Sequence, residues 1–85
     1  MALIRYDDAT MTSTPKTYKE MDTIRIPESI PQIGIRAGDA GVVDSVYDEG
    51  RMLLVEVSRT SDGLFAILDI ATEPDLRIVS YSKLD

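Results

Sequence analysis

The chain has 85 residues, of which 44% are hydrophobic, and it carries a net charge of -6 with neither cysteine nor histidine. This length predicts one domain with a small core. The missing residue types exclude disulfides, thiolate chemistry, cysteine-bound metal and a histidine that titrates near neutral pH. No apolar run reaches the roughly 20 residues of a membrane span, and no secretory signal precedes the domain, so we expect a cytoplasmic protein.

Residues 1–20 form a polar stretch that we expect to be a flexible leader, with Pro15 inside its most polar part. The leader is charge-balanced, so the whole net charge of -6 belongs to the chain from Met21 onward. An alternative concerns the short apolar segment Ala2–Tyr6, which can add a strand to the edge of a sheet, either its own or a neighbour's.

The first predicted strand is Asp22–Ile26, where alternation turns Ile24 and Ile26 inward. Pro27 ends it, and a long surface loop follows to Ala37, held to the core by three isoleucines: Ile30, Ile33 and Ile35. Four residues, Gly34, Gly38, Asp39 and Gly41, are then expected to shape a turn, with the Asp39 carboxylate bonded to local backbone N–H groups.

The second predicted strand is Ala40–Tyr47. Val43 and Val46 have opposite parity in it, so both can face the core only if a bulge lies near Asp44 and Ser45. After a turn at 48–50, the third strand is Met52–Val57, with Leu53, Val55 and Val57 inward and Glu56 outward.

Asp62 and Gly63, preceded by Ser61, predict the next hairpin, since Asp-Gly suits the primed two-residue turns. The fourth strand is Leu64–Ile70, a helical turn is expected at Thr72–Asp75 with Thr72 as its cap, and the fifth strand is Leu76–Ser80. Residues 81–85 are left as a C-terminal tail. The sequence therefore predicts an all-β fold, a small five-stranded, partly open barrel with one helical turn before its last strand.

The order of these motifs resembles a family of short uncharacterised bacterial domains with SH3-like barrels. The family pattern Gly-Leu-x-x-Gly-Asp-x-Gly-Thr-Val-Val, then Val-Glu-Phe and a final Leu-Arg, is similar to residues 34–43, 55–57 and 76–77, with Asp62-Gly63 and residues 68–70 between. The resemblance spans Asp22 to Val79. Val42, Val57 and Ile78 depart from the family's Thr, Phe and Pro. It implies an SH3-like fold and no activity, so no residue inherits a role.

The part Gly-Asp-x-Gly-x-Val, residues 38–43 here, is shared more distantly with KOW modules of ribosomal and transcription proteins and with the nitrile hydratase β-subunit type. A KOW-like nucleic-acid-binding module is therefore the alternative function, favoured if Arg25, Arg36, Arg51 and Arg77 gather on one face. The net charge of -6 opposes it, so nucleic acid is an unexpected partner.

The sequence predicts no catalytic residue, metal site or cofactor. Two acidic pairs, Asp48 with Glu49 and Glu73 with Asp75, can be read as an oxygen-only cation site, but their spacing does not match a calcium loop, and solvated turn carboxylates are the simpler interpretation. The glycines of 34–41 lack the helix and the Lys-Ser/Thr pair of a phosphate loop. We therefore expect that the protein is not an enzyme.

These observations leave a non-catalytic protein-interaction or accessory module as the predicted function, with a protein partner or a second copy of the chain and no membrane. The partner would meet an exposed strand edge, the loop from Pro27 to Ala37, or an apolar patch on the sheet. The residues predicted for that patch are Tyr47, Met52, Leu54, Phe65 and Ile67.

Overall fold

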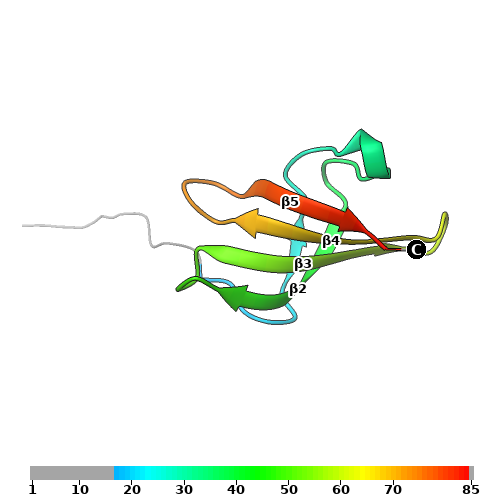
Figure 1. Cartoon of the computed structure of the whole chain (residues 1–85). Helices are drawn as coiled ribbons and strands as arrows, with labels where there is room; N and C mark the ends of the chain where they lie inside the picture. Colours follow the sequence, from blue (N-terminus) through cyan, green and yellow to red (C-terminus); the bar gives the residue numbers. More distant parts are fainter. Residues whose placement is uncertain (1–16, 85) are drawn as a thin grey trace, which may run out of the picture.

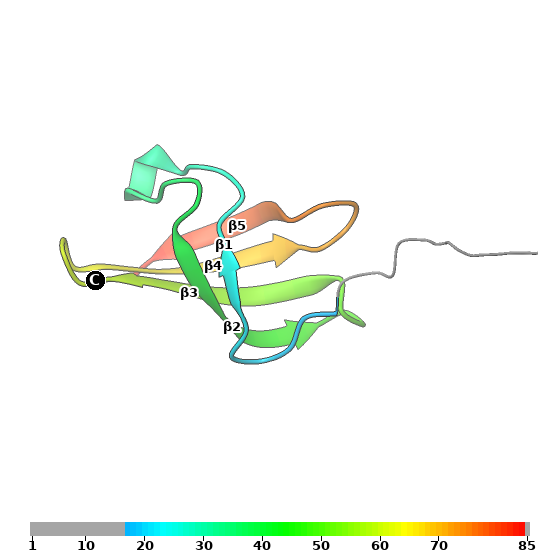
Figure 2. The ribbon, with the colours of Figure 1, turned by 180° about the vertical axis from the view of Figure 1, so that it is seen from behind.

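The computed structural model describes residues 17–84. Within them, five strands form one antiparallel sheet in chain order: β1 (Thr23–Arg25), β2 (Ala40–Tyr47), β3 (Met52–Arg59), β4 (Leu64–Ala71) and β5 (Arg77–Lys83). Figures 1 and 2 show the strands side by side, with β1 crossing beside β2. The predicted all-β fold with five strands is confirmed. The sheet is not closed into a barrel, because β1 and β5 are its two edges.

The core lies on one side of the sheet and follows the predicted alternation. Leu53, Val55 and Val57 of β3 are buried, and so are Leu68 and Ile70 of β4. The loop between β1 and β2 covers this side of the sheet. The other buried residues of the hydrophobic core are Ile24, Ile26, Ile30, Ile35, Val43, Leu64 and Ala66. Tyr18, Ile33 and Val46 pack against them. The three isoleucines predicted to hold the loop do so.

The bulge predicted in β2 is confirmed. Val43 pairs with Val55 and Ser45 pairs with Leu54, so Asp44 is the extra residue. This insertion keeps both Val43 and Val46 on the core side. A second irregularity in β5 is new: Asp69 pairs with Ser80 and Ile70 with Ile78, which leaves Val79 as the extra residue.

The helical turn predicted at Thr72–Asp75 is wrong. Thr72 does not cap a helix, because its N–H donates to the Arg51 carbonyl at 2.9 Å and its hydroxyl to the Gly50 carbonyl at 2.9 Å. The short helix is instead η1 (Pro31–Ile33), a 3-10 turn that begins at a proline and ends where the Gly34 N–H donates to the Pro31 carbonyl.

The chain ends of the described region differ from the predicted boundaries. β5 continues to Lys83, three residues beyond the predicted end at Ser80, and takes in part of the expected tail. Residues 1–16 of the predicted leader, and with them Ala2–Tyr6, lie outside the described residues. Within residues 17–84 there is no helix of the length and apolarity needed to cross a membrane.

Candidate functional site

The side of the sheet away from the core carries every residue predicted for the apolar patch. Because Leu53, Val55 and Val57 turn inward, Met52 and Leu54 of β3 turn outward. Their cross-strand partners follow: Tyr47 pairs with Met52, Leu54 with Asp69, Glu56 with Ile67 and Ser58 with Phe65. We call this side the outer face.

Aromatic and aliphatic side chains on the outer face reach solvent. Phe65 is 37% exposed and Tyr47 43% exposed, whereas Met52, Leu54 and Ile67 are half-buried. Val42 pairs with Glu56 on the same side and is also exposed, although the sequence analysis did not include it. The structure therefore brings the five predicted residues together and adds Val42 to them.

A chain of hydrogen bonds crosses the middle of the outer face. The Tyr47 hydroxyl donates to Asp69 Oδ1 at 2.8 Å, reaching over β3 from β2 to β4. The Ser80 hydroxyl on β5 donates to Asp69 Oδ2 at 2.7 Å. Both oxygens of this carboxylate therefore hold partners within the sheet.

The Asp69 carboxylate raises the pKa of Tyr47 above its ordinary value of 10.0, first through the hydrogen bond that the neutral phenol donates and then through burial and negative charge. We expect one of the chain's four tyrosines to ionise at higher pH than the others in an absorbance titration at 295 nm. A raised folded pKa stabilises the fold fully below about pH 10, and this contribution is lost as the pH rises through the folded pKa.

Two variants identify this tyrosine. Tyr47→Phe should remove the late step from the titration, and Asp69→Asn should move that step toward the ordinary tyrosine range. Ser80→Ala keeps the Tyr47 bond and should leave a late step in place. Four tyrosines that titrate together in the wild-type protein would contradict the assignment.

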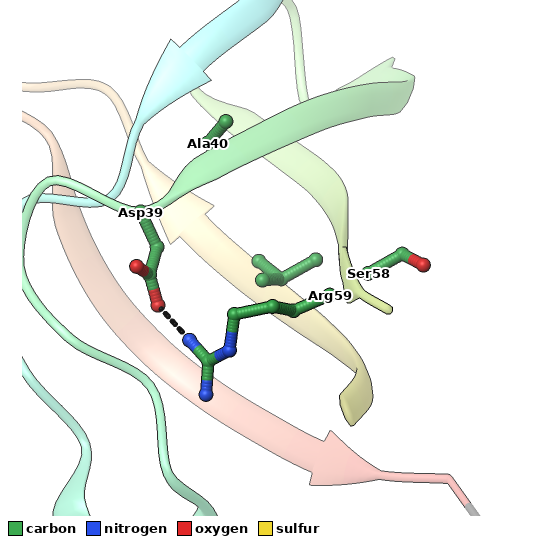
Figure 3. Close-up of a pocket in the computed structure, with 5 residues that line it drawn as sticks. Asp39, Ala40, Ser58 and Arg59 are labelled. Atoms are coloured by element: carbon green, nitrogen blue, oxygen red, sulfur yellow. Dashed lines mark hydrogen bonds and ion pairs between the residues drawn. The ribbon is translucent and has the colours of Figure 1, made fainter. Parts of the chain in front are cut away.

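A second polar cluster lies where β3 ends at the β3–β4 hairpin and centres on Arg59 (Figure 3). Its guanidinium donates to Asp39 Oδ2 at 2.8 Å, the contact drawn in Figure 3. It also donates to the Gly34 carbonyl at 2.8 Å and to both carboxylate oxygens of Asp62 at 2.8 and 3.1 Å. Arg59 and Asp39 are both about four-fifths buried in their side chains. One arginine therefore joins the β3–β4 hairpin to the loop before β2.

Arg59 and Asp62 shift each other's ionisation. The hydrogen bond from Arg59 lowers the pKa of Asp62 below its ordinary value of 3.8, against a smaller opposing effect of burial. The same bond raises the pKa of Arg59. A hollow of about 190 Å³ lies beside the Arg59–Asp39 ion pair and is lined by Asp39, Ala40, Val57, Ser58 and Arg59. It is smaller than the roughly 300 Å³ at which small-molecule pockets begin.

The sequence predicted no role for Arg59. One signal was present: Arg59 continues the parity of Leu53, Val55 and Val57, which places it on the core side of β3. A charged residue at an inward position calls for a partner. The partner Asp39 is 20 residues away, and only the folded chain brings the two together.

The predicted turn residues differ in their backbone conformation and in their place in the fold. Gly34, Gly38 and Gly63 have positive φ angles of 80°, 92° and 71°. The Asp39 carboxylate accepts the Arg36 N–H at 2.9 Å, as predicted. Gly41 is wrong as a turn residue, since it lies buried within β2 and its φ is not positive. A Cβ at Gly41 would lie 2.6 Å from Val55 Cγ1, so close packing explains the glycine.

The hairpin at Asp62 and Gly63 is present, but its predicted turn type is wrong. A type I′ turn needs positive φ at both central residues, and among the residues between β3 and β4 only Gly63 has it. The reason is local: the Asp62 carboxylate accepts the Leu64 N–H at 3.3 Å and is held by Arg59, so Asp62 closes a four-residue loop at 60–63.

The four arginines considered for nucleic-acid binding do not form one cluster. Arg25 pairs with Ala40 at the start of β2, and its side chain donates to the Gly38 carbonyl nearby. Arg51 follows the far end of β2 and bonds Asp48 and Glu49. Arg36 lies in the loop before β2, and Arg77 pairs with Ala71, whose neighbour Thr72 donates its N–H to the Arg51 carbonyl. The positive charge is therefore divided between the two ends of the sheet.

The acidic turns do not assemble into a metal site in the part of the chain that the structure describes. Asp48 and Glu49 turn their oxygens to Arg51, at 3.0 and 3.2 Å. No group of three or more aspartate or glutamate side chains in residues 17–84 is placed to hold a metal ion.

Comparisons with known proteins add no relative to this geometry. No protein-family model matches the chain, and neither a curated protein nor a solved structure matches it.

Proposed function

We propose that this chain is a non-catalytic protein-interaction module and that its partner docks on the outer face. The observation that carries the proposal is the gathering of Tyr47, Met52, Leu54, Phe65 and Ile67 on the side of an open sheet that the core does not use. Apolar side chains that share an exposed face favour contact with another macromolecule.

The hydrogen bonds of Asp69 support covering by a partner. A carboxylate that loses water without new bonds is costly to bury. Asp69 already accepts hydrogen bonds from Tyr47 on one oxygen and from Ser80 on the other. A partner can therefore cover the centre of the outer face without supplying donors of its own.

Net charge favours one kind of partner. The outer face itself carries charges of both signs, from Arg25 and Arg77 and from Glu56 and Asp69. The whole chain carries -6, which attracts a positively charged protein at long range and repels a second copy. The proposed partner is a different protein that has a positive net charge and an apolar contact surface.

The experiment compares Phe65→Asp with a matched control, Met21→Asp. Met21 is also apolar and exposed, at 77%, and it precedes β1. Wild-type protein captures candidates from a cell extract, and each candidate is purified and measured by titration calorimetry. We expect a protein that binds wild type and Met21→Asp equally and binds Phe65→Asp about 30-fold or more weakly, the loss typical of a central contact residue.

Three outcomes would overturn the proposal. The first is that every captured protein binds Phe65→Asp as well as wild type. The second is a two-chain mass in light scattering that Phe65→Asp abolishes, which would assign the face to a second copy. The third is salt-sensitive binding of labelled RNA or DNA oligonucleotides by the wild-type chain, which would favour the KOW-like alternative.

A further inference from the structure

The edge of the sheet formed by β5 is long and lies open in residues 17–84. β5 pairs with β4 on one side and with no described strand on the other. It spans seven residues, all exposed except the half-buried Ile78, whereas the edge strand β1 spans three. An edge of this kind presents unpaired backbone groups that an extended chain can bond.

The backbone groups that face this edge can be named. The Leu84 N–H donates to the Phe65 carbonyl of β4 at 2.8 Å. Because antiparallel strands alternate, the N–H of Ser82 also points to β4, and those of Tyr81 and Lys83 point to the open edge. Tyr81 and Lys83 therefore offer their backbone N–H and C=O groups to an added strand.

The side chains along β5 define the chemistry of that strand. Val79, Tyr81 and Leu84 are among the exposed large hydrophobic residues. Arg77 and Lys83 place a cation at each end, and neither forms an ion pair within residues 17–84. The edge fits an extended segment with apolar residues in its middle and carboxylates at the Arg77 end.

The chain itself contains such a segment before Thr17. Residues 2–8 are Ala, Leu, Ile, Arg, Tyr, Asp and Asp: a three-residue apolar run, then Arg5 and Tyr6, then two carboxylates. The first described residues lie at the end of the sheet that holds the β2–β3 turn and the β4–β5 loop, as both views show (Figures 1 and 2). β5 begins at that end with Arg77.

Residues 9–16 are long enough to carry residues 2–8 to the open edge of β5. The eight residues 9–16 separate Asp8 from Thr17 and span up to about 26 Å when extended. The five strand spacings from the position of β1, where Met21 bonds Val43, to a strand outside β5 amount to about 24 Å. With Asp8 beside Arg77, the residues before Asp8 would lie progressively closer to Lys83. Residues 2–8 would then run from the Lys83 end to the Arg77 end, antiparallel to β5. In that register Asp7 and Asp8 would meet Arg77, and Leu3 and Ile4 would meet the stretch around Tyr81.

We propose that residues 2–8 add to the open edge of β5 of the same chain as an antiparallel strand. This proposal goes beyond the docking of a partner, because it concerns a different surface and a different occupant. A second copy fits the edge less well: a two-fold axis centred on β5 would set Arg77 of one chain opposite Lys83 of the other, and like charges that face each other repel.

The test is amide hydrogen exchange on the full-length chain. In the wild type, the amides of Tyr81 and Lys83 should exchange about tenfold or more slowly than in Ile4→Pro, because proline interrupts a strand ladder. Thr12→Pro, which places the same residue between the segment and Thr17, should keep wild-type rates. The buried amide of Val55 reports in each variant that the core is intact.

Two results would overturn the proposal. One is equal exchange of Tyr81 and Lys83 in the wild type and in Ile4→Pro. The other is protection that rises with protein concentration together with a two-chain mass in light scattering, which would mean that a neighbouring molecule covers the edge. Neither result depends on Phe65 or on a foreign partner, so this test and the test of the outer face can fail separately.

Discussion

Replacing Arg59 by methionine is expected to lower the melting temperature by roughly 5–10 °C at neutral pH, the scale set by lost charge-assisted hydrogen bonds in a domain of this size. Methionine keeps much of the side-chain volume but supplies no donor. The Gly34 carbonyl and the Asp39 carboxylate would each lose an arginine N–H at 2.8 Å, and the hairpin would lose its link to the loop before β2. Thermal denaturation followed by far-UV circular dichroism measures the change.

The effect of Arg59→Met should also depend on pH. Arg59 lowers the pKa of Asp62 in the folded state below the ordinary 3.8. A lowered folded pKa stabilises the fold above the ordinary carboxyl pKa, and this contribution is lost as the pH falls through the folded pKa. The difference in melting temperature between wild type and Arg59→Met should therefore narrow as the pH falls from about 5 to about 3.

Arg36→Met provides the matched control. Arg36 lies in the loop before β2, is exposed, and its side chain makes no hydrogen bond or ion pair within residues 17–84. Its replacement removes the same charge and should change the melting temperature by about 1–2 °C at most. Equal losses in Arg36→Met and Arg59→Met would show that net charge matters and that the bonds of Arg59 do not.

The alternation of side chains predicted most of the sheet. Leu53, Val55 and Val57 recur at every second position, which defines both a strand and its buried side without knowledge of the partner strand. The opposite parity of Val43 and Val46 was enough to predict the bulge at Asp44. The outer face followed from the same rule, since whatever alternates with the buried residues must lie on the other side.

The errors arose where a residue's partner is distant in sequence. Thr72 has the local features of a helix cap, yet its bonds go to Gly50 and Arg51 across the hairpin. Arg59 bonds Gly34 and Asp39, which local patterns cannot reveal. β5 continues past the predicted end at Ser80 to Lys83; the added residues show no apolar alternation, and an exposed edge strand does not need it.

Gly41 shows the same limit in a single residue. Its neighbours Gly38 and Asp39 form a turn, so proximity in sequence favoured a turn role for Gly41 as well. The reason for the glycine is a close approach of β3 and of Ile26, which no local pattern encodes: a Cβ there would meet Val55 Cγ1 at 2.6 Å and Ile26 Cδ1 at 3.0 Å.

Gly41→Ala is expected to destabilise the protein by about 1–3 kcal/mol, because the added methyl group overpacks a site between two fully buried side chains. The sign of the change in the free energy of unfolding distinguishes close packing from open space at position 41. Where space is open and φ is negative, replacing glycine by alanine stabilises a fold by about 0.4–1 kcal/mol through the unfolded chain. Urea denaturation followed by circular dichroism is the measurement, since the chain has no tryptophan.

A double-mutant cycle with Val55→Ala separates the collision from other effects of the alanine. Val55→Ala alone should destabilise the core, since it removes buried methyl groups. It also removes Cγ1, the atom that the new Cβ would meet most closely, so Gly41→Ala should cost less in that background, with a coupling of about 1 kcal/mol or more. Additive losses would mean that Val55 does not oppose a side chain at position 41. The glycine would then be required by Ile26 or by the backbone, and Ile26→Val, which removes Cδ1, distinguishes the two because it relieves only the first.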